Sequence, residues 1–297
     1  MIARSSFVVA LLLVVGCGSS SRAPVAPPSP VTTESANPAT PTASNGDADV
    51  AAIKAAVNGP QRSEENRARD KYRHPAETLA FFGLKKDMTV LETFPGGGWY
   101  TEIVAPVVAE KGKLFVTSVD PNGPADKMGP KMARQLMDRF AAQPNVFGKV
   151  QVLRIDPPAS FDLGAANSVD LVLVMRSIHD WVRDGDAEKI LGELHRVLKP
   201  GGILGVEAHR GPEGTSSDPK VVGKSGYLSE SFLKQLVEAS GFTLVAKSEI
   251  NANPNDTHEW PEGVWTLPPT LRLKDKDREK YVAVGESDRV TMKFVKK

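Results

Sequence analysis

An apolar strand pattern that runs directly into three consecutive glycines constrains the fold of this chain more than any other feature. Residues 90–102 read Val-Leu-Glu-Thr-Phe-Pro-Gly-Gly-Gly-Trp-Tyr-Thr-Glu. Consecutive glycines let the backbone turn sharply and approach a ligand with no Cβ in the way, and a following helix points free N–H groups at the same place. The stretch therefore predicts a strand, turn and helix that hold a nucleotide.

The segments after the glycines alternate between strand and helix patterns. Strands are predicted at residues 88–93, 114–119, 150–155, 169–175 and 203–207, and helices at 63–82, 99–110, 131–143 and 186–198. Pro75 divides the first helical stretch in two. Because the strands are apolar on both faces, we expect an α/β fold with a doubly wound, mostly parallel sheet and a ligand site beyond the strand C-termini.

The C-terminal part departs from this alternation. A helix at residues 229–240 and a strand at 243–250 precede a loop at 251–287 and a last strand at 289–295. Two strands with no helix between them are expected to pair antiparallel. Asp120 follows the second strand, about twenty residues beyond the glycines, where an acidic group accepts hydrogen bonds from ribose hydroxyls.

The N-terminus has the pattern of an export signal. Arg4 precedes an apolar run at residues 7–15 that is too short to span a bilayer. The run ends in Val-Val-Gly-Cys, which resembles a bacterial lipobox and implies that residues 1–16 are a lipoprotein signal peptide and that Cys17 carries the lipid. The alternative is an ordinary signal peptide followed by a buried cysteine. Cys17 is the only cysteine, so no intramolecular disulfide can form.

Lipidation would place the domain at the cell envelope, facing the periplasm and joined to the membrane through Cys17. Gly18 and Ser19 carry no acidic retention signal, which by resemblance to lipoproteins favours the outer membrane over the inner one. Residues 17–46 are rich in Ser, Pro, Ala and Thr and predict a disordered tether. A lead-in helix at 47–59 and a single domain at 60–297 follow.

The charge balance argues against a nucleic-acid partner. The chain has 37 basic and 36 acidic residues, and thus a net charge of +1. A small-molecule substrate fits this balance better than a polyanion.

Residues 60–297 resemble class I S-adenosylmethionine-dependent methyltransferases, a family with a seven-stranded sheet whose last strand is antiparallel. Within the family, the chain is similar to a bacterial group of predicted methyltransferases. Four stretches carry the resemblance: residues 69–75 (RDKYRHP), 95–102 (PGGGWYTE), 176–181 (RSIHDW) and 288–290 (DRV). The LKPGG sequence at 198–202 is a weaker marker of the superfamily.

The resemblance implies that S-adenosylmethionine is the cofactor. The residues that would bind its methionine part are Glu92, Pro95, Gly96, Gly97 and Gly98. Asp120 would hold the ribose, and Asp156 would lie near the adenine amine. The usual motif has a glycine where this chain has Phe94. We expect a β-branched residue at Gly97 to abolish cofactor binding, because the turn is predicted to need unusual dihedral angles.

Polar residues after the fourth and fifth strands are the catalytic candidates. His179 follows Arg176 and precedes Trp181, at the edge where class I enzymes present groups to the substrate. A histidine there could act as a general base, or it could be a structural residue that bonds backbone groups. Glu207 and His209 end the fifth strand. A metal site formed with His179 lacks the short spacing that such sites show.

Aromatic and basic residues elsewhere are candidates for closing the site. Tyr72 and Arg73 could cover the cofactor or lie on a solvated helix face. Trp260 and Trp265 lie in the long loop at 251–287, which predicts a lid over the substrate, or else a segment packed against the sheet edge.

Two other functions remain compatible with these patterns. A nicotinamide-dependent reductase would need a third glycine where this chain has Thr101. A non-catalytic envelope domain that retains the fold is the other alternative, because an exported transferase needs a supply of a cofactor that is made in the cytoplasm.

Overall fold

A computed structural model describes residues 45–157 and 160–297. The predicted signal peptide, Cys17 and most of the predicted tether lie outside the described residues. The described part begins with α1 (Asn45–Val57), which corresponds to the helix expected at 47–59.

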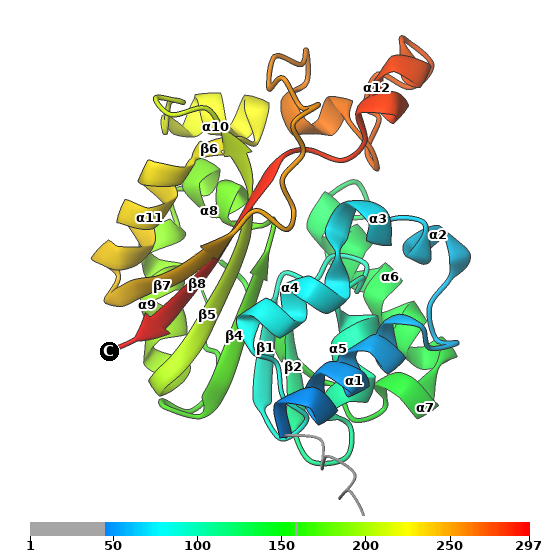
Figure 1. Ribbon diagram of the computed structural model, residues 1–297, viewed down its shortest axis with the longest axis vertical. Coiled ribbons are helices and arrows are strands. Elements are labelled where there is room, and N and C mark those ends of the chain that lie inside the picture. Colours follow the sequence, from blue (N-terminus) through cyan, green and yellow to red (C-terminus); the bar gives the residue numbers. More distant parts are fainter. Residues whose placement is uncertain (1–44, 158–159) are drawn as a thin grey trace, which may run out of the picture. The chain divides into compact units, whose positions relative to one another are not determined.

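A single mostly parallel sheet organises the domain (Figure 1). Its strands follow one another in space in the order β3-β2-β1-β4-β5-β8-β7, and the two-residue β6 pairs with β5. The last strand, β8, is antiparallel to both of its neighbours. The strands are β1 (Thr89–Thr93), β2 (Lys113–Ser118), β3 (Gln151–Arg154), β4 (Val169–Met175), β5 (Leu198–Gly211), β6 (Leu228–Ser229), β7 (Phe242–Ser248) and β8 (Arg289–Lys296).

This topology confirms the predicted fold class. The order reverses between β1 and β4, since the chain runs outward from β1 to β3 and then returns to β4 on the other side. Ligands of open parallel sheets bind at such a reversal, beyond the carboxyl ends of the strands. The glycine turn follows β1 and His179 follows β4, so both lie at that edge.

Helices cover both faces of the sheet and create two apolar cores (Figure 1). One core packs α8, α9 and α11 against the sheet, and the other packs α1, α4, α5 and α6. The α-helices after α1 are α2 (Glu64–Arg67), α3 (Asp70–Arg73), α4 (Pro75–Phe82), α5 (Thr101–Val108), α6 (Met128–Ala142), α7 (Pro144–Phe147), α8 (Ile178–Asp184), α9 (Ala187–Val197), α10 (Pro219–Ser225), α11 (Glu230–Ala239) and α12 (Arg278–Val284).

The split predicted at Pro75 is confirmed. His74 adopts a left-handed backbone with φ 38° between α3 and α4, as a residue kept out of the helical region by the following proline can do. The consequence for the site is that α3 and α4 are separate helices, and α3 lies near the C-terminal edge of the sheet.

Other segments differ from the prediction. Helix α8 is absent from the expected elements, because its seven residues are too few for a helical period to stand out. Strand β5 continues to Gly211 because its end pairs with β6 and β8. The predicted loop at 251–287 contains a short 3₁₀ helix, η1 (Gly263–Thr266), and α12.

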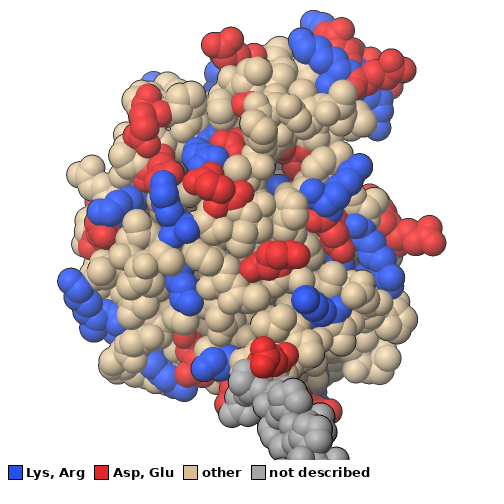
Figure 2. All heavy atoms as spheres, in the orientation of Figure 1, with Lys and Arg blue, Asp and Glu red and all other residues tan. Residues whose placement is uncertain are grey.

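Two further observations concern the exterior. In the described part of the chain, no helix combines the length and hydropathy needed to cross a bilayer. Basic and acidic side chains are interspersed over the face shown in Figure 2, in line with the net charge of +1.

Candidate active site

Two adjoining cavities lie at the C-terminal edge of the sheet. The arginine cavity, named for Arg69, Arg73 and Arg176 in its wall, has a volume of about 320 Å³. The β2 cavity, lined by Thr117, Ser118 and Val119 at the end of β2, has a volume of about 660 Å³. Both volumes fall in the range of small-molecule sites. The residues that line both cavities are Phe94, Pro95, Gly96 and Asp180.

The glycine turn lies between the two cavities, and Gly96 lines both of them. Gly96 and Gly98 have φ values of 58° and 79°, which favour glycine, whereas Gly97 lies outside the left-handed region. A Cβ on Gly98 would lie 2.9 Å from Leu136, but a Cβ on Gly97 would meet no protein atom within 4 Å. The expectation that Gly97 needs unusual dihedral angles is therefore wrong, and that constraint falls on its two neighbours.

Phe94 shows why the usual motif has a glycine at this position. Its φ is 47°, a left-handed conformation that costs a non-glycine residue roughly 1–2 kcal/mol. Aromatic contacts offset this cost: the ring stacks on Phe161 at 6.2 Å and packs at a tilt against Trp181 at 5.7 Å. Phe94 thus forms an apolar wall between the cavities.

Glu92 lies behind the glycine turn and contributes to the arginine cavity. Its Oε2 accepts a hydrogen bond of 2.7 Å from the Thr101 hydroxyl, and burial raises the pKa of the Glu92 carboxyl to about 7. Thr101, which stands where a dinucleotide-binding motif has its third glycine, therefore orients this carboxyl. A cationic ligand group beside Glu92 would favour the ionised form.

Asp120 and Asp156 follow β2 and β3 as predicted, and both are exposed. The Asp120 carboxylate accepts a hydrogen bond from the backbone N–H of Asn122 at 2.9 Å. Asp156 pairs with Ser160 through two backbone hydrogen bonds of 2.7 Å. Neither side chain lines the β2 cavity itself, although Val119 and Pro157, their chain neighbours, do.

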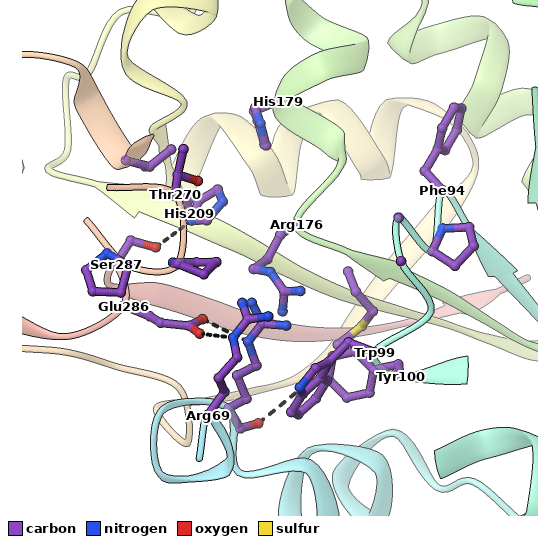
Figure 3. A pocket seen from close by; sticks show the side chains of 18 of the residues that line it. Arg69, Phe94, Trp99, Tyr100, Arg176, His179, His209, Thr270, Glu286 and Ser287 are labelled. Carbon is purple, nitrogen blue, oxygen red and sulfur yellow. Dashed lines mark hydrogen bonds and ion pairs between the residues drawn. The ribbon is translucent and has the colours of Figure 1, made fainter. Parts of the chain in front are cut away.

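His179 and His209 meet in the wall of the arginine cavity, 5.2 Å apart between ring centroids (Figure 3). Burial lowers the pKa of both imidazoles, and that of His209 falls well below its usual value. The buried Nδ1 of His179 has no hydrogen-bond partner in the described part of the chain. His209 Nδ1 lies 2.6 Å from the Ser287 hydroxyl. A neutral imidazole with an unpaired ring nitrogen can accept a proton.

Glu207 lies apart from the two histidines, in a buried ion-pair network. It is fully buried, and its oxygens lie 3.2 Å from Arg176, 3.3 Å from Arg289 and 3.0 Å from the Tyr100 hydroxyl. A carboxylate engaged in this way holds neighbouring side chains in place rather than accepting a proton from a substrate.

Arg69 and Glu286, which sequence reasoning missed, complete this network (Figure 3). Glu286 accepts from the Nε of both Arg69 and Arg73 at 2.8 Å and lies 3.0 Å from Arg289. Arg69 lies in the RDKYRHP stretch and could have been singled out there. Glu286 could not, because nothing in the sequence shows that the residues before β8 return to α3.

Residues 251–287 contribute to the arginine cavity through Trp265, Pro268, Thr270 and Ser287, among others. Trp265 packs against His179 at 5.9 Å. Trp260 instead donates to Asp256 at 2.6 Å and packs on Tyr281, outside both cavities.

Three other predicted residues occupy different places. Arg73 lines the arginine cavity and Trp181 the β2 cavity. Tyr72 lines neither cavity, and Lys71 lies over its ring. Among residues 45–157 and 160–297, no group of three or more His, Cys, Asp or Glu side chains is arranged to hold a metal ion.

Comparison with known proteins finds a family match to part of this chain. Residues 95–206 match the family model described as a methyltransferase domain. No sequence among the curated proteins matches this chain.

Solved structures share the fold at low identity. One is a SAM-dependent methyltransferase from Aquifex aeolicus, with 19% identity, a TM-score of 0.51, and coverage of 83% of this chain and 97% of that one. A candidate sarcosine dimethylglycine methyltransferase from Galdieria sulphuraria has 14% identity and a TM-score of 0.51, with coverage of 85% of this chain and 98% of that one. The 4+2 cyclase SpnF has 17% identity and a TM-score of 0.50, with coverage of 85% of this chain and 94% of that one.

The family match covers residues 95–206 and is to a methyltransferase domain, and solved methyltransferases share the fold. The residues present fit S-adenosylmethionine: the backbone of Gly96 and Gly97 lines the arginine cavity with open space where a Cβ would lie, and the buried Glu92 carboxyl lines the same cavity. The β2 cavity, next to the ends of β2 and β4, offers room for the adenosine part.

Proposed function

We propose that this chain transfers a methyl group from S-adenosylmethionine to a small-molecule acceptor bound in the arginine cavity. The observation that carries the proposal is the meeting of two cavities at Phe94, Pro95 and Gly96, directly above the glycine turn. One cavity can hold the nucleoside while the other holds the reacting groups.

The roles of the site residues follow from their positions. When bound, S-adenosylmethionine supplies an electrophilic methyl group on a sulfonium. Glu92 and the backbone of the glycine turn at Gly96, Gly97 and Gly98 would hold the methionine part, and Asp120 would reach the ribose from the tip of β2. His179, buried and neutral, would accept a proton from the acceptor. Trp265 would shield that step from water.

Binding of the demethylated product tests the proposal. At one hundred times its dissociation constant, S-adenosylhomocysteine should stabilise the folded chain by about 2.7 kcal/mol. For a domain of this size, that corresponds to a rise in melting temperature of roughly 5–11 °C. NADPH should cause no shift. A shift with NADPH alone would favour the reductase, and no shift with either compound would favour a non-catalytic envelope domain.

We also propose that the chain is an exported lipoprotein anchored through Cys17, in the outer membrane rather than the inner one. The support is the apolar run at residues 7–15, the Val-Val-Gly-Cys sequence and the tether-like composition that follows.

Replacing Cys17 with serine should abolish labelling by a fatty-acid analogue, because the thioether to the lipid cannot form. The wild-type chain should be labelled and should fractionate with the envelope. Recovery of the unlabelled wild-type chain in the cytosol would contradict the assignment and would also remove the question of how the cofactor reaches the domain.

A further inference from the structure

The ion-pair network in the wall of the arginine cavity and directly behind it contains more positive charge than its acids neutralise. The buried network consists of Arg69, Arg73, Arg176 and Arg289, against Glu207 and Glu286. Two positive charges are therefore in excess. Glu92 could offset one of them only when ionised. Asp180, the remaining acid in the lining, is paired with Arg183.

The excess charge is directed at the cavity. In the described part of the chain, Arg69 and Arg73 each bind Glu286 through Nε, so their terminal nitrogens are not used by a protein acceptor. Of the guanidinium nitrogens of Arg176, only Nη1 donates to a protein acceptor in the described part of the chain, which is Glu207 at 3.2 Å. Figure 3 shows the guanidinium groups of Arg69 and Arg176 turned toward the same space.

The surrounding structure holds these arginines in place. Arg73 lies 4.7 Å from the centre of the Trp99 ring, and Arg176 lies 5.9 Å from that of Tyr100. Arg176 also has a left-handed backbone with φ 58°, which is uncommon for a residue with a Cβ and is typical of functional sites. Burial lowers the pKa of Arg69; Glu286 opposes this shift, while the like charges of Arg176 and Arg289 add to it.

The cofactor does not remove the excess. S-adenosylmethionine carries one carboxylate, one ammonium and one sulfonium, so its net charge is positive. Its single carboxylate could pair with one arginine, but the loaded site would then be more positive than the empty one. Guanidinium groups grouped in this way bind carboxylates and phosphates in a bidentate manner.

We propose that the methyl acceptor carries an anionic group, a carboxylate or a phosphate, and that Arg69, Arg73 and Arg176 bind it. This inference rests on the proposed function, because it names the substrate class of the same cavity. The bound anion would orient the acceptor so that its nucleophilic atom lies near His179.

Calorimetric titration of inorganic phosphate into the full chain saturated with S-adenosylhomocysteine tests the inference. We expect a single saturable site that coexists with the nucleoside. Mutual exclusion of the two ligands would overturn the inference, because the arginines would then be the cofactor's carboxylate site. A parallel titration with acetate distinguishes the two kinds of anionic group on the acceptor. Tighter binding of phosphate indicates a phosphate ester, and tighter binding of acetate indicates a carboxylate.

Substitutions with opposite expected effects separate binding from folding. Arg69→Gln should weaken phosphate binding at least ten-fold. Because the Arg69 side chain is 22% exposed, we expect the folded chain to tolerate its loss. Glu286→Gln should tighten binding, because it releases Arg69 and Arg73 from their counter-charge. Arg210→Gln is the matched control: Arg210 is 20% exposed, is ion-paired and does not line the cavity. Melting temperatures identify any variant that is destabilised.

The outcomes also separate this inference from the proposed function. If S-adenosylhomocysteine binds and phosphate does not, the inference alone is overturned. If phosphate binds as expected and the nucleoside does not, the proposed function is overturned and the anion site remains. Unchanged phosphate affinity in both Arg69→Gln and Glu286→Gln would also overturn the inference.

Discussion

Replacement of His179 with alanine should lower turnover by about two to three orders of magnitude while leaving the affinity for S-adenosylhomocysteine nearly unchanged. The expected loss is that of a general base, which contributes about 10²–10⁴ in rate, whereas alignment of donor and acceptor can contribute up to about 7–11 kcal/mol and would remain. Turnover is measured as S-adenosylhomocysteine released with the acceptor that supports it.

The pH dependence gives a second readout of the same residue. Burial lowers the pKa of His179; Asp180 opposes this shift, while Arg183 and Arg176 add to it, and His209 lies beside it as a neutral imidazole. A base with a lowered pKa is deprotonated at neutral pH and takes up a proton only as the pH falls below the usual histidine value. The acid limb of the rate profile should therefore lie below about pH 6.5.

Two substitutions serve as comparisons for His179→Ala. His195 lies on α9 and packs against Phe242, away from both cavities, so His195→Ala should leave turnover unchanged. Asp120→Ala should weaken cofactor binding and leave the chemistry intact at saturation. If His179→Ala retains full turnover, the histidine is structural, and any acid–base role would pass to His209, since Glu207 is held by arginines.

The second large effect is expected at Gly96. Gly96→Val should abolish the thermal shift caused by S-adenosylhomocysteine, a loss of about 2.7 kcal/mol of ligand stabilisation at one hundred times the dissociation constant. The reason is twofold: φ at this position is 58°, which a β-branched residue adopts only with strain, and Gly96 lines both cavities.

A glycine next to it in the chain provides the control for folding. Gly97→Ala should leave the melting temperature of the unliganded chain unchanged, because a Cβ there meets no protein atom within 4 Å. Gly96→Val should lower the unliganded melting temperature through backbone strain at φ 58° and not through a steric clash, since the nearest atom to its Cβ is Met132 Sδ at 4.0 Å, so the ligand-induced shift is measured from the variant's own unliganded value. A full nucleoside-induced shift in Gly96→Val would contradict the assignment of the glycine turn as the cofactor cradle.

The sequence alone determined the fold class and the edge of the sheet that holds the site. Alternation of apolar strands with helical periods depends on local patterns, and parallel strands deliver their C-terminal residues to one edge whatever their order. Local patterns therefore suffice to place the glycine turn, Asp120, Arg176 and His179 at that edge. The antiparallel last strand was predicted because the segment before it shows no helical pattern; the pairing is confirmed, although η1 and α12 lie in that segment.

Only the tertiary structure decided which of these residues work together. Glu207 and His209 lie two residues apart on β5, yet Glu207 contacts Arg289 and Tyr100 whereas His209 contacts His179. Trp260 and Trp265 share one loop, but only Trp265 reaches His179. The charge excess of the arginine cavity depends on side chains from α3, from the end of β4 and from the segment before β8, which lie far apart in the sequence. Local patterns carry no information about such distant contacts, which the packing of β8 and α3 creates.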